Sequence, residues 1–184
     1  MILLRHGQSE FNLHFSATRR DPGIEDPCLT DLGHDQALRA AEALAGAGVR
    51  RIVASPYTRT LQTAGPIAQT LGLKVEVEPL VRERYAFSCD VGSPRSRLEA
   101  TWPHLDFSPL AERWWPEGPE PHDSVVERAT RFRAAQSALA DWSATLVVCH
   151  WGFIMAMTGI SVANGTWLLC DPTAPPPAAI SWRV

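Results

Sequence analysis

Near its N-terminus the chain reads Ile2-Leu3-Leu4-Arg5-His6-Gly7-Gln8-Ser9-Glu10-Phe11-Asn12, and the rest of the fold can be worked out from this segment. Apolar residues lead directly into Arg5 and His6, and polar residues suited to the start of a helix follow. This pattern predicts a buried strand that ends in a turn, the place where open α/β sheets bind their ligands. Arg5 supplies a fixed cation with a forked set of donors, and His6 can be a neutral nucleophile near pH 7. The pair therefore suits a phosphate group.

Two further apolar runs are predicted to be strands of the same sheet. Thr145-Leu146-Val147-Val148-Cys149 is continuous, as in strands buried on both faces of a parallel sheet, and it ends at His150. Arg51-Ile52-Val53-Ala54 is shorter, and Arg59 follows it closely. The carboxyl ends of parallel strands lie along one edge of a sheet, so we expect His6, His150 and Arg59 to meet there.

Helices are predicted between and after these strands. Thr30 has the chemistry of an N-cap, and apolar residues recur at helical spacing after it until Gly46. A second amphipathic stretch stops at Gly72, and Gly65-Pro66 should kink or break it. Ser124-Val125-Val126-Glu127 has the form of a capping box and predicts the start of a later helix. Helices that alternate with strands in this way are typical of parallel sheets.

The stretch between the third predicted strand, at 74–77, and Asp123 lacks a regular period. It holds three tryptophans, five arginines and many prolines, so it is too aromatic for a disordered linker. We expect a structured, irregular cap at about 79–123, and a short hairpin or edge strands in the tail. The predicted fold class is α/β: a single domain over residues 1–184, with a mostly parallel sheet wrapped by helices and a short irregular cap.

Composition narrows the class of partner. A chain of 184 residues, 45% of them hydrophobic, can bury one good core. A net charge of -3, with Lys74 the only lysine, argues against a nucleic-acid surface. No apolar run is long enough for a membrane span. The four cysteines have no C-x-x-C spacing and no signal-peptide pattern is present, so free thiols and a cytoplasmic location are expected. The expected partner is a phosphorylated small molecule, and the oligomeric state is left open.

Four motifs occur in an order that resembles the histidine phosphatase superfamily, the phosphoglycerate-mutase-like enzymes. They are Leu4-Arg5-His6-Gly7-Gln8-Ser9-Glu10-Phe11-Asn12, Leu29-Thr30-Asp31-Leu32-Gly33, Ser55-Pro56-Tyr57-Thr58-Arg59-Thr60-Leu61-Gln62-Thr63-Ala64 and Val147-Val148-Cys149-His150-Trp151-Gly152. The resemblance covers nearly the whole chain and implies a phosphoglycerate-mutase-like fold.

The same resemblance implies roles for individual residues. His6 would be the nucleophile that becomes phosphohistidine, and Glu83 would be the general acid. The groups implied to bind the transferring phosphoryl group are Arg5, Asn12, Arg59 and His150. Glu10, Glu99 and Glu112 are alternatives to Glu83, because they are carboxylates of uncertain placement in the same chain.

The chain departs from the family pattern after its late histidine and before its late helix. Trp151 stands where the family usually has a glycine, which keeps a backbone N–H but changes the shape of the pocket. Asp123-Ser124 replaces the usual Glu-Ser. In the cap, Arg95 and Arg97 are candidates for contact with substrate, because arginines one residue apart on an extended segment face the same way.

The predicted activity is hydrolysis of a phosphomonoester through a phosphohistidine on His6, without cofactor or metal. Phosphoglycerate-mutase-type phosphoryl transfer is the main alternative, and an inactive phosphate-binding scaffold is the lesser one. A metal hydrolase is disfavoured, because the histidines form no H-x-x-x-H or H-E-x-x-H pair. A cysteine hydrolase using Cys149 and His150 is disfavoured because adjacent strand residues point to opposite faces. The sequence does not name the substrate.

Overall fold

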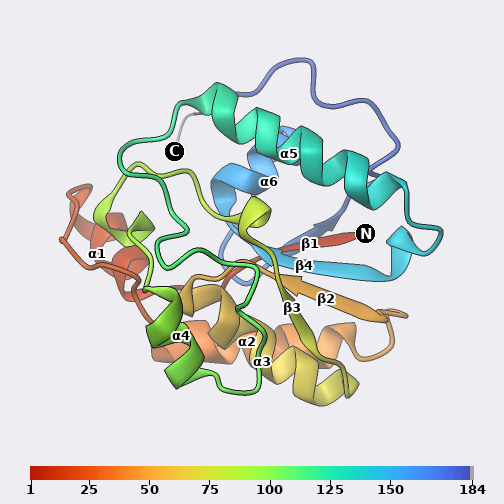
Figure 1. Cartoon of the computed structure of the whole chain (residues 1–184), viewed down its shortest axis with the longest axis horizontal. Coiled ribbons are helices and arrows are strands. Elements are labelled where there is room, and N and C mark those ends of the chain that lie inside the picture. The colour runs from red at the N-terminus through yellow and green to blue at the C-terminus, as the bar shows by residue number, and fades with distance from the viewer. Residues whose placement is uncertain (183–184) are drawn as a thin grey trace.

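The computed structural model describes residues 1–182, and it has a five-stranded sheet at its centre (Figure 1). The strands are β1 (Ile2–Arg5), β2 (Arg51–Ala54), β3 (Val75–Val77), β4 (Thr145–Cys149) and β5 (Trp167–Leu169). Their order is β3-β2-β4-β1-β5, and all neighbours are parallel except β5, which pairs antiparallel with β1. The predicted mostly parallel sheet is confirmed, and β5 is the edge strand expected in the tail.

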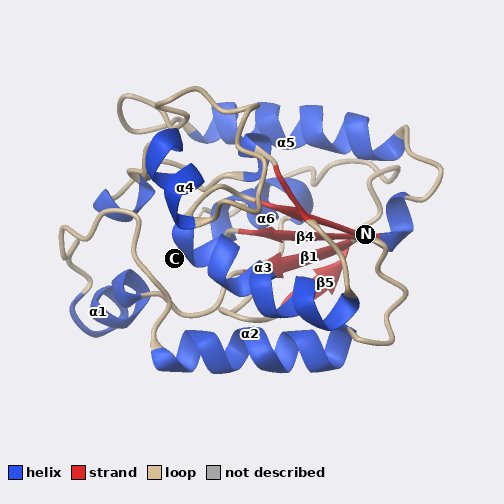
Figure 2. Cartoon of the chain, turned by 60° about the horizontal axis from the view of Figure 1, so that its bottom comes forward, coloured by secondary structure: helices blue, strands red, loops and turns tan. Residues whose placement is uncertain are grey.

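Two layers of helices enclose the sheet (Figure 2). The helices are α1 (Glu10–Thr18), α2 (Asp31–Leu44), α3 (Thr58–Leu71), α4 (Arg95–Thr101), α5 (His122–Ser137) and α6 (Trp151–Thr158). Short 3₁₀ helices are η1 (Pro79–Val81), η2 (Ser88–Asp90) and η3 (Trp142–Ala144). Helices α2 and α3 cover one face of the sheet, and α5 and α6 cover the other (Figures 1 and 2).

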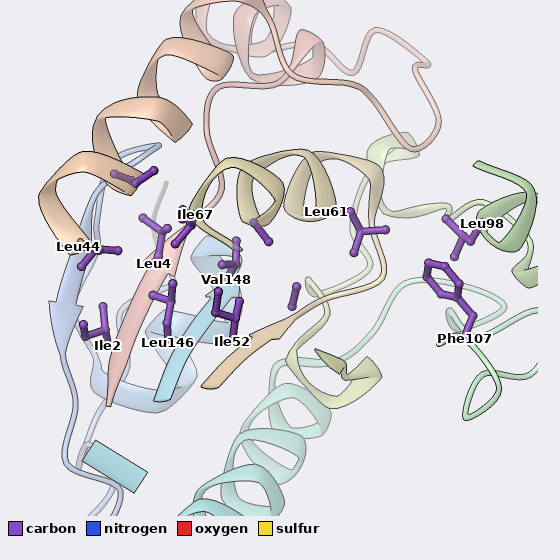
Figure 3. Close-up of a cluster of buried hydrophobic side chains, with 14 of the residues drawn as sticks. Ile2, Leu4, Leu44, Ile52, Leu61, Ile67, Leu98, Phe107, Leu146 and Val148 are labelled. Carbon is purple, nitrogen blue, oxygen red and sulfur yellow. The ribbon is translucent and has the colours of Figure 1, made fainter. Parts of the chain in front are cut away.

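Alternate residues of each strand enter two separate cores. Leu4 and Val148 pack with α2 and α3 in one core, which Figure 3 shows, whereas Leu3 and Val147 pack with α5 and α6 in the other. This alternation follows from the period of two in a strand. Because both faces of the inner strands are buried, β4 reads as an unbroken apolar run rather than an alternating one.

Two helix predictions need correction. A kink or break was expected at Gly65-Pro66, but α3 is not broken there and continues from Thr58 to Leu71 with Pro66 inside it. Its packed face, which includes Leu61 and Ile67, keeps the helix on the sheet despite the missing N–H. Helix α5 begins at His122 rather than after Ser124, and no side chain caps it.

Helix α6 was not predicted. It is buried almost all round, from Gly152 to Met157, so its sequence has no amphipathic period to detect. It follows directly from the end of β4 and lies between α5 and the sheet.

The cap contains more regular structure than expected. Arg95 and Arg97 lie on α4, so the extended segment assumed for them is wrong. Residues two apart on a helix point in clearly different directions, and the two guanidinium groups do not share a face. Leu98 and Phe107 join the core on the α3 side (Figure 3). The predicted domain runs to residue 184, and residues 183–184 lie outside the described part.

No helix within residues 1–182 is long and apolar enough to span a bilayer.

Candidate active site

The parallel pairing of β1 with β4 brings His6 and His150 together. Arg5 is opposite Cys149 in the register, and the His6 N–H donates to the Cys149 carbonyl at 3.0 Å. The next residue of each strand is a histidine, and the two rings lie edge to face with centroids 5.1 Å apart. Both side chains are buried. The two histidines therefore lie together at the edge of the sheet, as the sequence predicted.

The ring of His6 is held so that one nitrogen is free. Nδ1 lies 2.7 Å from the carbonyl oxygen of Gly7. A carbonyl only accepts, so Nδ1 carries the hydrogen and Nε2 keeps its lone pair in the neutral ring. Burial, together with Arg59 and Arg5, holds the pKa of His6 well below its ordinary value, although the bond to Gly7 opposes this. His6 is therefore neutral near pH 7, with an unprotonated Nε2.

A close approach of two backbones shapes the turn after His6. A Cβ placed on Gly7 would collide with the carbonyl of Gly33, and one placed on Gly33 would collide with the carbonyl of Gln8. Gly33 lies in the first turn of α2, whose N-cap Thr30 accepts from the Gly33 N–H at 3.1 Å, as predicted for Thr30. Because neither glycine has a side chain, α2 can pack directly against the turn that follows His6.

Arg5 and Arg59 place two guanidinium groups in the same pocket as His6. Arg5 ends β1, its Nη1 donates to the Val162 carbonyl at 2.9 Å, and its buried Nε has no partner among the described residues. Arg59 lies in the first turn of α3, donates from Nη1 to the Cys89 carbonyl at 2.7 Å, and stacks over the Tyr57 ring. Two fixed cations of this kind can grip the oxygens of a phosphoryl group.

Asp90 is a pocket residue that the sequence did not indicate. Its carboxylate lies 3.4 Å from Nη2 of Arg59 and accepts from the backbone N–H groups of Ala86 and Phe87 at 3.0 and 3.1 Å. Burial raises the pKa of Asp90 to about 6, against the opposing effect of Arg59. The carboxylate thus steadies both Arg59 and the turn at 86–90. No sequence signal marked it, because its partner lies on another element.

His150 supports the site from behind. Its Nε2 shares a 2.8 Å hydrogen bond with the Ser55 hydroxyl, and its buried Nδ1 has no partner among the described residues. Burial, then the nearby Arg59, hold its pKa well below the ordinary value. His150 packs edge to face on both His6 and Tyr57, and it is not among the residues that line the pocket. The unpaired Nδ1 is its one polar atom available to a ligand.

The side chain of Glu83 lies against the N-terminal end of α6. Its carboxylate accepts from the Gly152 N–H at 2.9 Å (Oε1) and 3.2 Å (Oε2), and from the Arg84 N–H at 2.8 Å. A Cβ at position 152 would collide with this carboxylate, so the contact requires glycine there. The chain has lost the family's glycine at position 151, where Trp151 stands, but it keeps Gly152. Trp151 lines the pocket and donates from its indole to Ser161 at 2.9 Å. Glu83 lines the pocket, whereas Glu10, Glu99 and Glu112 do not.

A buried ionic group, which we call the Glu120 cluster (Arg82, Glu120, Ser124 and Arg128), holds the segment before Glu83. Arg128 binds both oxygens of Glu120 at 2.8 Å, and Arg82 and Ser124 each donate to Oε1 at 2.9 Å. Arg128 also donates to the carbonyls of Leu80 at 2.6 Å and Arg82 at 3.1 Å. Ser124 therefore serves Glu120 rather than the helix N-terminus, which explains why the predicted capping box is absent.

Asn12 lies on α1 and lines the pocket. Its Oδ1 accepts from the Ser9 N–H and from Nδ2 of Asn164, both at 3.1 Å. Because the Ser9 N–H can only donate, the amide is oriented with its oxygen bound and its NH₂ group left for a ligand. Asn164, which sequence reasoning missed, also donates to the His6 carbonyl at 3.1 Å and so links the tail to the turn.

The pocket has a volume of about 400 Å³, within the range of small-molecule sites. Of the predicted residues it contains Arg5, His6, Asn12, Arg59, Glu83 and Trp151. Arg95 and Arg97 do not line it, and Arg95 instead lies 3.6 Å from Glu99 and 3.9 Å from Glu112.

Known proteins with similar sequences are phosphatases and mutases. The chain is 32% identical over 183 residues to a glucosyl-3-phosphoglycerate phosphatase of Mycolicibacterium vanbaalenii, which covers 89% of this chain and 76% of that protein. It is 35% identical over 161 residues to a probable phosphoglycerate mutase, GpmB, of Proteus mirabilis, with coverage of 82% and 68%.

A solved structure shows the same arrangement. The native structure of mycobacterial glucosyl-3-phosphoglycerate phosphatase superposes with a TM-score of 0.62 at 26% identity, covering 91% of this chain and 87% of that one. The predicted phosphoglycerate-mutase-like α/β fold and the predicted phosphatase class are thereby confirmed. With the sequence profile of the family matching residues 1–170, the chain belongs to the histidine phosphatase superfamily (branch 1).

Proposed function

We propose that this phosphatase works through a phosphohistidine on His6. The observation that carries the proposal is the free Nε2 of His6 in a pocket shared with the Arg5 and Arg59 guanidinium groups. Nε2 attacks phosphorus while the bond from phosphorus to the ester oxygen breaks. Arg5 and Arg59 bind the equatorial oxygens, over which the negative charge spreads in the transition state. The NH₂ group of Asn12 is a neutral donor suited to the same oxygens. His150 lies behind His6 rather than in the pocket lining, and its unpartnered Nδ1 is the atom through which it would reach the phosphoryl group.

Glu83 acts as the general acid in this scheme. It gives its proton to the departing alkoxide, and in the second step it takes a proton from the water that attacks phosphohistidine and releases phosphate. Its place in the pocket supports this role, and the Gly152 N–H fixes the position of the carboxyl group. The three rival carboxylates lie outside the pocket.

The cap favours hydrolysis over mutase-type transfer. A mutase holds a second phosphate while its intermediate turns over, which calls for a second cluster of free cations. Arg95 and Arg97, the residues considered for that site, lie outside the pocket. The pocket arginines other than Arg5 and Arg59 have other contacts: Arg19 is over the Phe15 ring and Arg84 donates to the Glu120 carbonyl at 3.4 Å.

Trapping the intermediate tests the mechanism. Brief reaction with a ³²P-labelled ester, quenched without acid, should leave label on the wild type and none on His6→Ala. Substantial turnover by His6→Ala would refute the role of His6.

A product assay separates the two reactions. With 3-phosphoglycerate, a trace of 2,3-bisphosphoglycerate and a panel of phosphomonoesters, we expect phosphate release from a panel member and no 2-phosphoglycerate. Rapid interconversion with little free phosphate would establish the mutase reaction instead.

The proposal also includes the substrate class, the cellular location and the domain organisation of the enzyme. A small-molecule substrate, a cytoplasmic location and a single domain with a cap at about 79–123 remain predictions. Cys28, Cys89, Cys149 and Cys170 are free in the structure.

A further inference from the structure

One side of the pocket is aromatic. We call Phe11, Phe15 and Phe87 the phenylalanine wall. The Phe11 and Phe15 rings stack with centroids 5.2 Å apart, and Phe87 lies 5.6 Å from Phe11 and 5.0 Å from Phe15. All three line the pocket that also contains His6 and Arg59. Phosphate chemistry uses none of these rings, so they need another explanation.

The wall is built from two separate elements that are fastened together. Phe11 and Phe15 are one turn apart on α1, whereas Phe87 precedes η2 in the cap. The cap segment is tied to the loop after α1 by Asp21, which accepts from the Ser88 N–H at 2.8 Å and from the Ser88 hydroxyl. The wall is therefore preorganised, which favours binding because less conformational entropy is lost.

Two of the three rings of the wall are only partly buried. Phe11 is buried, but Phe15 and Phe87 keep part of their surface open on the pocket side. Apolar surface that faces a small-molecule pocket gains free energy when a ligand covers it, and aromatic faces gain further from stacking. A polar leaving group, such as a sugar or a glycerate, would not gain this free energy, because it has no apolar surface to place against the rings.

The charges around the wall do not favour a second anionic group. Arg19 lies at the rim, with its guanidinium 5.7 Å from the Phe15 ring centre, an arrangement that suits the ring rather than a ligand anion. Arg84 donates to the Glu120 carbonyl at 3.4 Å. Arg5 and Arg59 are the two pocket guanidinium groups assigned to the phosphate, so a second anion would have to draw Arg19 or Arg84 from these contacts.

We propose that the phenylalanine wall binds the leaving group and selects phosphate esters of aryl or arylalkyl alcohols. The inference rests on the proposed function, because it places the phosphate at His6. It adds the chemical class of the alcohol, which is flat and apolar, and it assigns Phe15 and Phe87 as residues that determine specificity.

The test compares two esters that differ by one ring. Ethyl phosphate and 2-phenylethyl phosphate both release a primary alkoxide, so the chemical step makes similar demands on Glu83. We expect kcat/KM for the phenylethyl ester to be at least about tenfold higher in the wild type, since tenfold corresponds to about 1.4 kcal/mol of transition-state binding. Phe15→Ala and Phe87→Ala should each reduce that ratio by about threefold or more, and Phe15→Tyr, which keeps the ring, should retain it.

The control variant lies on the same helix. Leu13 is half exposed and does not line the pocket, so Leu13→Ala should keep the wild-type ratio. Binding of 2-phenylethylphosphonate and ethylphosphonate, measured by calorimetry, gives a second readout that needs no turnover. The dissociation constant of 2-phenylethylphosphonate should be lower than that of ethylphosphonate in the wild type. A thermal unfolding measurement on each variant checks that it is folded.

The outcomes separate this inference from the proposed function. A wild-type ratio near one, or a preference for 3-phosphoglycerate that Arg19→Gln abolishes, overturns the aromatic subsite while His6-dependent hydrolysis still stands. Loss of the ring preference in Leu13→Ala as well as in Phe15→Ala would also overturn it. If no ester is hydrolysed through His6, the proposed function fails, and the phosphonate measurements alone decide the inference.

Discussion

Replacing Arg128 by methionine removes the cation that ties the Glu120 cluster to the segment before Glu83. The substitution keeps an apolar stem and deletes the paired bonds of 2.8 Å to Glu120 and the bond of 2.6 Å to the Leu80 carbonyl. The Glu120 side chain is only 3% exposed, so it stays buried with Arg82 as its remaining cation. Removing one partner of a buried ion pair lowers the free energy of unfolding by about 3–5 kcal/mol.

The stability assay follows from that figure. For a domain of this size each kcal/mol shifts Tm by roughly 2–4 °C, so Arg128→Met should lower Tm by roughly 6–20 °C. The matched control is Arg50→Met, because Arg50 and Asp141 are 66% and 61% exposed and 3.9 Å apart. Exposed pairs contribute about 0–1 kcal/mol, so the control should shift Tm by no more than roughly 4 °C.

Arg128→Met should also change catalysis in a selective way, at a temperature where the variant is folded. Freeing the Leu80 carbonyl loosens the segment that presents Glu83, so esters whose alkoxide needs a proton should be slowed more than p-nitrophenyl phosphate. A fall in Tm as small as that of the control would refute the energetic argument. Equal slowing of both esters would refute the positioning of Glu83 by the cluster.

Other changes test the remaining groups. Glu83→Gln should slow alkyl phosphates much more than p-nitrophenyl phosphate, and equal losses would give Glu83 a structural role only. Because burial, Arg59 and Arg5 hold the pKa of His6 low, its acid limb in a kcat/KM profile should lie well below pH 6.5; a His6 limb at 6.5 would contradict this. Burial raises the pKa of Asp90 from 3.8 to about 6, so its contribution to folding is complete below pH 3.8 and is lost as the pH rises through about 6. Asp90→Asn should flatten the pH dependence of urea unfolding in that window, and an unchanged slope would count against the raised pKa.

Some local expectations failed where tertiary contacts prevailed. Ser124 had the sequence of a helix cap, but its hydroxyl donates to Glu120, which precedes α5 and also binds Arg128 of that helix. Arg95 and Arg97 were placed on an extended segment, and they lie on a helix whose Leu98 enters the core. Helix α6 escaped prediction because burial on all sides erases the amphipathic period.

Local sequence patterns are enough to predict which residues gather where the strands of the sheet end. Apolar runs that end in His6 and His150, with Arg59 after a third, are local patterns, and the geometry of parallel strands carries them to one edge of the sheet. That step needs only the strand direction and register. The fold class, and the meeting of His6, Arg59 and His150 near one sheet edge, could therefore be predicted without coordinates.

Only the tertiary structure decided what surrounds that centre. The contacts of Asp90 with Arg59, of Glu83 with Gly152 and of Phe87 with Phe15 each join segments far apart in the chain, and no periodicity or spacing encodes them. Each depends on how an irregular cap packs over the sheet. Because many packings satisfy the same composition, the leaving-group side of the pocket became visible only in three dimensions.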